Sequence, residues 1–234
     1  MIFVEDRLNT RRFSEAGLTL IECLVAIAVI SITTASIGPM MVFSVATRVQ
    51  NQRAEQALQL AQAEIDKVRL TVEQGGDYGK RLQDLSLYAD PAISVAANVP
   101  APNAFVGSTT STTPSLAVRQ ARSIDIDGDN TPDFAVQLFR TKGIEQSPVT
   151  GTISTPVVFQ IGVRVYDFRT ARAQVTTPGL ERDEAKLTFT SGEGQRGRRP
   201  LAVLYSQIGQ GDRNGALCEY WRFTGGTPTG MTCN

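Results

Sequence analysis

The sequence predicts an α+β fold in which a long N-terminal helix packs on a small antiparallel sheet. Three observations indicate this fold: an apolar run over residues 18–46, an amphipathic run over residues 47–76, and strand-like segments between residues 133 and 208. The apolar run is long enough to cross a membrane. Residues 77–234, called the head from here on, are numerous enough to bury one hydrophobic core.

The composition argues against an enzyme. The 234 residues include 23 lysines plus arginines, 23 aspartates plus glutamates, and no histidine. Histidine is the usual general base and a frequent metal ligand, so its absence excludes Ser-His-Asp and Cys-His catalysis and the common zinc sites. Because the charges balance, no overall field favours nucleic acid or an anionic membrane, and such binding would have to come from a local patch.

The apolar run contains one carboxylate, Glu22, and is preceded by a small residue, Gly17. A secretory signal has its small-residue cleavage site after the apolar stretch, whereas cleavage after Gly17 would keep the stretch in the mature chain. A carboxylate within a membrane costs about 2.5 to 3.5 kcal/mol on insertion scales, so Glu22 needs a partner.

Two interpretations of Glu22 follow from its position. If a protease cuts after Gly17, Leu18 gains a free α-amino group that lies one helical turn before Glu22. In a bundle of such helices, the amine of one subunit can neutralise the carboxylate of its neighbour. Alternatively, Glu22 lies near the helix end and reaches the membrane interface. Glu22 by itself leaves both interpretations open.

The segment from Ala16 to Ile30, AGLTLIECLVAIAVI, resembles the signature of type IV prepilins and type II secretion pseudopilins. The resemblance implies that the leader, residues 1–17, is removed after Gly17 by a membrane peptidase that also methylates the new N-terminus at Leu18. It also implies that Glu22 serves in assembly. Leu18 stands where phenylalanine is commonest in the family, and Cys23 stands where a branched aliphatic residue is usual.

The same resemblance implies where the protein acts and with which partners. It implies an inner-membrane protein with a cytoplasmic N-terminus and a periplasmic head, which joins a pilus or pseudopilus. The expected partners are other pilins or pseudopilins, the prepilin peptidase and an inner-membrane assembly platform. Residues 23–30 and 46–66 are similar to a cyanobacterial pseudopilin group linked to hormogonium polysaccharide secretion.

Gly38 and Pro39 interrupt the helical pattern, because proline lacks the backbone donor and clashes with the preceding turn. A kink within the helix is one interpretation. In the pilin family a proline near this position lets the helix unwind in the filament, and the two interpretations are compatible.

After the apolar run, the helix is expected to continue and then to end at Gly75 and Gly76. Apolar residues spaced alternately by four and three predict one stripe that faces a sheet. The stripe consists of Ala54, Leu58, Ala61, Ile65, Val68 and Val72.

The head is expected to combine a long surface loop with strands. Residues 89–115 are rich in alanine, proline, serine and threonine and predict a loop. Alternating patterns predict strands over residues 133–141, 157–168, 185–190 and 201–208.

A cluster of aspartates within residues 125–133 predicts a Ca²⁺ site. Calcium takes six to eight oxygen ligands, and the segment resembles the DxDGDxxxD loops of extracellular repeats, with Asn130 tolerating the left-handed turn. The expected carboxylate ligands are Asp125, Asp127, Asp129 and Asp133, and Thr131 would add its carbonyl. The alternative is an acidic turn before a strand.

Two further features concern the last part of the chain. Cys218 and Cys233 are close in sequence and predict a disulfide, and thus a location outside the reducing cytosol. Arg196, Arg198 and Arg199 predict either a solvated loop or a patch for DNA or an acidic polysaccharide.

The sequence therefore leads to two functional hypotheses. The first is a minor pilin or pseudopilin that assembles through its N-terminal helix, in a type IV pilus or a type II secretion-like machine. The second is a minor pilin whose head is an adhesin or a DNA- or glycan-binding module, acting through residues 89–115 or the arginines.

Overall fold

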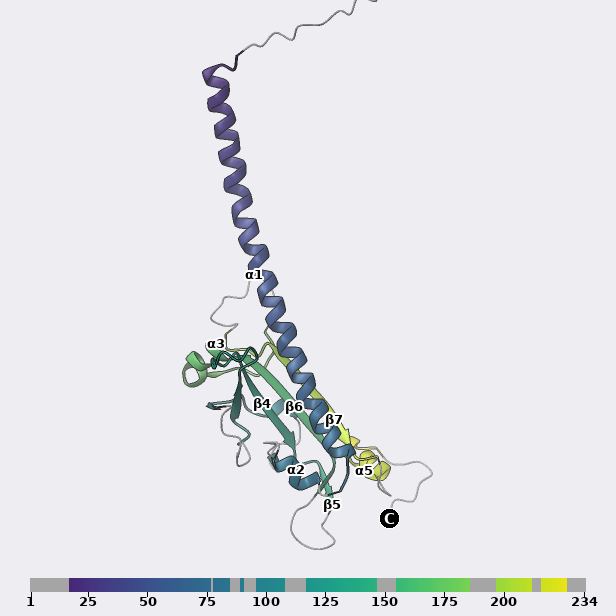
Figure 1. Ribbon diagram of the computed structural model, residues 1–234. Coiled ribbons are helices and arrows are strands. Elements are labelled where there is room, and N and C mark those ends of the chain that lie inside the picture. Colours follow the sequence, from purple (N-terminus) through teal and green to yellow (C-terminus); the bar gives the residue numbers. More distant parts are fainter. Residues whose placement is uncertain are drawn as a thin grey trace, which may run out of the picture. The chain divides into compact units, whose positions relative to one another are not determined.

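The computed structural model describes residues 17–76, 78–84, 89–90, 96–107, 117–146, 155–185, 197–211 and 216–226. Contacts between residues divide the chain into two compact units, residues 1–49 and residues 50–234. The expected α+β architecture is confirmed: a long helix is followed by a mostly antiparallel sheet (Figure 1).

Helix α1 (Leu20–Glu73) is continuous and contains Pro39. The helix therefore has no break at Gly38 and Pro39 in this single chain, and the predicted kink there stays a prediction. A proline removes only one backbone donor, and its fixed φ is compatible with helix, so the turns on either side can persist. Whether the helix unwinds in a filament stays a prediction.

Hydroxyl groups in the middle of the apolar run donate to carbonyls of α1. Ser31 donates to the Ile27 carbonyl at 2.7 Å, Thr34 to the Ile30 carbonyl at 2.8 Å, and Ser36 to the Thr33 carbonyl at 2.8 Å. These polar side chains therefore need no water, which makes them compatible with an apolar environment.

The second half of α1 buries one stripe, as expected, but its members differ. The buried residues are Ala57, Ala61, Glu64, Ile65, Val68 and Val72. Leu58 was expected in the stripe and is 39% exposed, whereas Ala57 is fully buried. Positions three and four residues before Ala61 both fit a period of 3.6, and close packing favours the smaller side chain. The helix ends before Gly75 and Gly76, which both have positive φ, as predicted.

The sheet has β6 (Thr155–Asp167) at its centre. Strand β4 (Phe134–Thr141) pairs with one edge of β6, β7 (Ala202–Gly209) pairs with the other edge, and both pairings are antiparallel. Strand β5 (Ile144–Gln146) continues the β4 edge, and β3 (Gln120–Ile124) pairs antiparallel with β4. The two parallel pairings are β2 (Ala104–Val106) with β3 and β1 (Ala89–Asp90) with β4.

These strands confirm three of the four predicted ones. The prediction for residues 185–190 is tested only at Ala185, which is not in a strand, because residues 186–190 lie outside the described residues. Among the described residues of the head, the helices are α2 (Tyr78–Asp84), α3 (Phe168–Gln174) and α5 (Ala216–Thr224), with short helical turns η1 (Ala96–Asn98) and η2 (Val175–Gly179).

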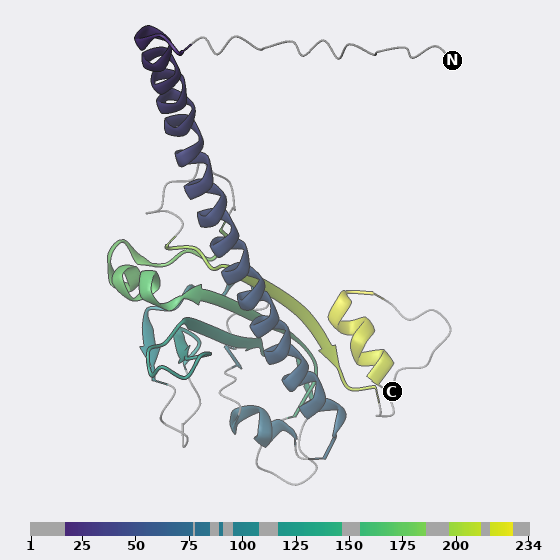
Figure 2. The ribbon, with the colours of Figure 1, turned by 45° about the horizontal axis from the view of Figure 1, so that its top comes forward.

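The main core lies between the second half of α1 and one face of the sheet (Figure 2). Val68 and Ala61 of α1 pack there with Phe159 and Val163 of β6, all of them fully buried. Two ion pairs join the same elements: Arg122 of β3 lies 2.6 Å from Glu64, and Arg53 lies 2.6 Å from Asp167. The apolar stripe and these ion pairs therefore fix the register of the helix on the sheet.

The opposite face of the sheet is covered by part of the segment that was expected to be a loop. Ala96 and Val99 pack on Phe139, and residues 104–106 form β2. The prediction of a loop over residues 89–115 was thus wrong for residues 89–90, 96–99 and 104–106, while residues 91–95 and 108–115 lie outside the described residues. The alanine- and proline-rich composition suggested a loop, but contacts with distant residues of the sheet hold this segment in place.

Arg164 of β6 makes several of the hydrogen bonds that hold residues 96–100 against the sheet. Its side chain is completely buried and donates to the carbonyls of Val99 at 2.8 Å and of Ala97 at 3.3 Å, and to the hydroxyl of Tyr205 at 3.1 Å. The guanidinium also lies 4.8 Å from the centre of the Phe139 ring. Gln137 donates to the Pro100 carbonyl at 2.8 Å beside it.

The ring of Phe139 has room only because residue 162 is a glycine. A Cβ atom at Gly162 would lie 2.4 Å from Cε2 and from Cζ of Phe139. The ring cannot move aside easily, since it is fully buried between Gly162 and the Arg164 guanidinium.

We predict that Gly162→Ala destabilises the head by about 1 to 3 kcal/mol, the usual cost of overpacking a core. The measurement is the denaturant midpoint of the full chain in detergent. Gly211→Ala is the matched control, because nothing lies within 4 Å of a Cβ atom at Gly211. Equal midpoints for the two variants would contradict the close packing of Gly162 on Phe139.

Candidate functional site

The predicted cleavage site precedes the first turn of α1. Residues 17–19 are not helical, and the helix begins at Leu20. Thr19 caps it: its carbonyl accepts from the backbone N–H of Glu22 at 3.0 Å and of Cys23 at 3.2 Å. The peptide bond between Gly17 and Leu18 therefore lies outside the helix, where a protease can bind it in an extended form.

The cap has a sequence signature that the sequence analysis missed. Thr19 and Glu22 are spaced as in a capping box, Thr-x-x-Glu, and the Glu22 N–H also approaches the Thr19 hydroxyl, at 3.4 Å. Such a pair marks the start of a helix. The signature would have located the first helical residue correctly.

Glu22 lies in this first turn and is exposed. A carboxylate there interacts favourably with the unsatisfied N–H groups and the positive end of the helix dipole. Leu18 precedes the helix, so the expected spacing of one helical turn between its nitrogen and Glu22 is absent from this uncleaved chain. Pairing between subunits stays a prediction.

The first half of α1 exposes apolar side chains on all sides. Leu24 is 55% exposed, Ile30 63% and Phe43 61%. By length and composition α1 could cross a membrane, and the most apolar window has a mean hydropathy of 2.2 with none of its residues buried. A surface of this kind is normally covered by lipid or by other chains.

Residues 12–38 match the family described as the prokaryotic N-terminal methylation motif. The matched range contains Gly17, Leu18 and Glu22 and ends just before Pro39.

The chain thus carries a prepilin-type N-terminal segment.

The match is confined to this N-terminal segment and carries no information about the head. The comparisons with curated proteins and with solved structures gave no match. What the head does must therefore be inferred from its own residues.

The predicted arginine patch is largely engaged in internal contacts. Glu181 accepts from Arg199 Nε at 2.8 Å, and one of its carboxylate oxygens lies 3.2 Å from Arg198. Arg198 also donates to the Gly179 carbonyl at 2.9 Å. Arg198 and Arg199 lie in a turn and are partly exposed, which is compatible with the predicted solvated loop, but their pairing with Glu181 means that they are not a free basic patch. Arg196 lies outside the described residues. The partner Glu181 is separated from them in sequence, which the composition of the arginine run cannot reveal.

Cys23 and Cys218 differ in their bonding. Cys23 is a free, exposed cysteine in the first half of α1. Cys218 in α5 is disulfide-bonded, whereas Cys233 lies outside the described residues, so the Cys218–Cys233 pairing stays a prediction.

The acidic loop between β3 and β4 brings three of its four aspartates together. Carboxylate oxygens of Asp125, Asp127 and Asp133 all lie within 4.8 Å of one another. Asn130 has a φ of 65°, which confirms the left-handed turn predicted there. Asp129 was predicted as a ligand but is not part of this group; one of its oxygens accepts from the Thr131 N–H at 2.6 Å.

Backbone donors inside the loop orient the carboxylates. Asp125 accepts from the Gly128 N–H at 2.7 Å and from the Asn130 N–H at 2.8 Å, and these bonds lower its pKa. The bond from the Asp129 N–H lowers the pKa of Asp127, but desolvation and the charges of Asp129 and Asp133 outweigh it, so the net shift is upward. Asp127 is thus the carboxylate whose ionisation the loop itself opposes.

The arrangement fits the donor set that Ca²⁺ takes. Each carboxylate has about four lone-pair sites, so oxygens that accept one backbone bond can still bind a cation. A cation at the meeting point of the three oxygens would offset the repulsion that raises the Asp127 pKa. Calcium binding by this loop stays a prediction, and so does the ligand role of the Thr131 carbonyl.

We predict that Asp127→Asn weakens Ca²⁺ binding by about tenfold or more, because Asp127 belongs to the converging group. Asp129→Asn is the matched control and should weaken binding less. The measurement is a Ca²⁺ titration of each full-length variant in detergent, followed by amide chemical shifts. Equal effects of the two substitutions, or no Ca²⁺-dependent shifts in the wild type, would contradict the assignment.

Proposed function

We propose that this protein is a minor pilin or pseudopilin subunit that assembles through α1 into a pilus or pseudopilus. The machine would be a type IV pilus or a type II secretion-like system. The observation that carries the proposal is the matched motif at residues 12–38, which includes the start of a helix with apolar side chains exposed on all sides. A folded head follows on the same chain, as a structural subunit requires.

In this proposal the chain first resides in the inner membrane. Arg7, Arg11 and Arg12 precede the apolar run, which favours a cytoplasmic N-terminus and a periplasmic head. The prepilin peptidase then removes residues 1–17. The non-helical backbone at residues 17–19 supports this step, because the bond to be cut needs no unwinding of α1.

Assembly then depends on the charge of Glu22. Within one chain its carboxylate has no ion pair with a described residue and lies in the first turn of α1, so a partner from a neighbouring subunit would lower the cost of placing it in an apolar bundle. The new α-amino group of Leu18 on a neighbouring subunit supplies that partner. Pro39 would permit local unwinding of α1 in the filament.

The role is structural rather than catalytic in this proposal, and the whole chain contains no histidine. A contribution to polysaccharide secretion and motility rests only on the similarity of residues 23–30 and 46–66 to cyanobacterial pseudopilins.

A second candidate function is a ligand-binding head. It is favoured by a cleft of about 490 Å³ that includes residues 101–103, within the segment where such binding was predicted.

We predict that the mature protein begins at Leu18 and carries a methylated α-amino group. Mass spectrometry of the protein from cells with an active prepilin peptidase measures this directly. Cells that lack the peptidase provide the control and should retain residues 1–17. An intact Met1 start in peptidase-positive cells would refute the processing.

We also predict that Glu22→Ala is cleaved normally but enters filaments about tenfold or more less efficiently. The substitution leaves the Leu18 amine unpaired among apolar helices, where a charge costs about 2.5 to 3.5 kcal/mol. Quantitative immunoblots of the membrane and sheared-filament fractions measure the ratio. Glu55→Ala, at another exposed glutamate of α1, is the matched control and should assemble normally. Normal incorporation of Glu22→Ala would exclude the pairing role.

A further inference from the structure

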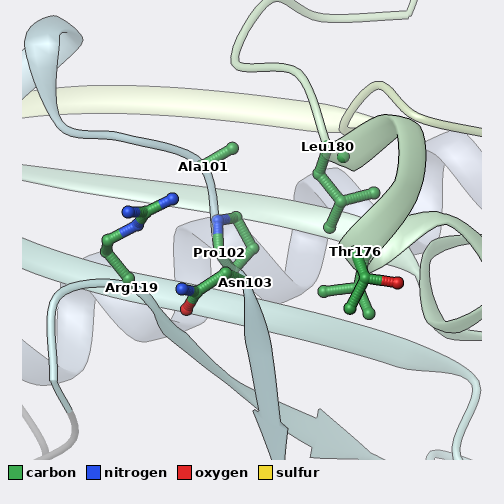
Figure 3. A pocket seen from close by; sticks show the side chains of 8 residues that line it. Ala101, Pro102, Asn103, Arg119, Thr176 and Leu180 are labelled. Atoms are coloured by element: carbon green, nitrogen blue, oxygen red, sulfur yellow. The ribbon is translucent and has the colours of Figure 1, made fainter.

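The head contains a cleft whose described lining residues all lie outside α1. It lies between residues 101–103 with Arg119 on one side and residues 175–180 on the other, and its volume is about 490 Å³ (Figure 3). Pockets of about 300 to 1,000 Å³ are typical of small-molecule sites. The cleft is therefore large enough for one or two sugar rings.

The first wall of the cleft is held by backbone contacts. The Asn103 N–H donates to the Arg119 carbonyl at 2.9 Å, directly before β2 and β3 begin to pair. The Gln120 side chain accepts from the Ala117 N–H at 3.0 Å, which closes the turn that leads into Arg119. The backbone that carries Asn103 and Arg119 is thus fixed in the absence of a ligand.

The second wall is held by the arginine contacts described above. Arg198 donates to the Gly179 carbonyl, and Glu181, next to Leu180 of the cleft, is paired with both Arg198 and Arg199. The Tyr166 hydroxyl donates to the Glu181 carbonyl at 2.8 Å. Because both walls are preformed, a ligand would pay little conformational entropy on binding.

The charge of the cleft is positive. Arg119 is exposed and makes no ion pair with a described residue, in contrast to Arg198 and Arg199. None of the described residues that line the cleft is acidic. Figure 3 shows the Arg119 and Asn103 side chains on the side of Pro102 opposite Thr176 and Leu180. A guanidinium that no described residue pairs, in a preformed cleft, is suited to a carboxylate, which it can bind through two parallel hydrogen bonds.

We propose that this cleft binds an acidic sugar residue of an anionic polysaccharide. The Arg119 guanidinium binds the carboxylate of the sugar. The Asn103 amide, both donor and acceptor, binds ring hydroxyls, while Pro102 and Leu180 contact the C–H groups of the ring. The site is separate from α1, so binding and filament assembly can succeed or fail independently.

The test is titration of the full-length protein in detergent with trigalacturonate, followed by amide chemical shifts and calorimetry. We expect saturable binding, with shifts at residues 101–103, 119 and 175–180, and no binding of the neutral maltotriose at the same concentration. Arg119→Gln should weaken binding by about tenfold or more, because it removes the charge-assisted pair. Arg69→Gln is the matched control: it removes the same charge from an exposed arginine of α1 and should bind as the wild type does.

Several outcomes would overturn the proposal: no saturable binding, equal weakening by both substitutions, or equally tight binding of triglutamate, which would indicate an acidic peptide site. The thermal midpoint of Arg119→Gln, expected to equal that of the wild type, excludes loss of the fold as the cause of weaker binding. Filament incorporation of Arg119→Gln is measured in parallel and should be normal. A loss of incorporation would assign Arg119 to subunit contacts and overturn the separate role of the cleft. Normal incorporation of Glu22→Ala, by contrast, would contradict only the proposed assembly function.

Discussion

Helix α1 keeps its backbone hydrogen bonds both where its apolar side chains are exposed and where it packs on the sheet. The packing of the head depends on this continuity. The first half of α1 exposes apolar side chains on all sides and satisfies the hydroxyls of Ser31, Thr34 and Ser36 on its own carbonyls. Its second half buries a single stripe against the sheet and gains ion pairs there. A continuous helix can serve both surroundings because its backbone needs no partner from outside.

The two glutamates Glu22 and Glu64 show how α1 handles a carboxylate in each half. Glu64 is buried in the stripe, and Arg122 of the adjacent sheet lies 2.6 Å away, so its charge is paired within the chain. Glu22 has no such partner among the described residues and lies in the first turn of α1. The same physical requirement is met inside the subunit for Glu64, and in our proposal between subunits for Glu22.

The opposite face of the sheet depends on a buried guanidinium. Burying a charge is costly unless its donors are satisfied, and Arg164 donates to the side chains of Gln137 and Tyr205 and to three carbonyls, those of Ala97, Val99 and Pro100. The aromatic rings of Phe139 and Tyr205 also lie near the guanidinium. These contacts order residues 96–100, and residues 101–103, which line the cleft, follow directly. A segment rich in alanine and proline is therefore part of a preformed site.

Much of the fold follows from the sequence because the signals are local. Periodicity predicts α1 and the strands β4, β6 and β7, and the need for positive φ predicts the helix end at Gly75 and the turn at Asn130. The match to the methylation motif is likewise a property of one contiguous segment. Only the tertiary structure decided that Ala57 rather than Leu58 is buried and that Asp129 lies outside the acidic group. It also decided that Glu181 pairs with Arg198 and Arg199. Each of these outcomes depends on how side chains meet in three dimensions, through packing space and charges separated along the chain, which sequence spacing does not determine.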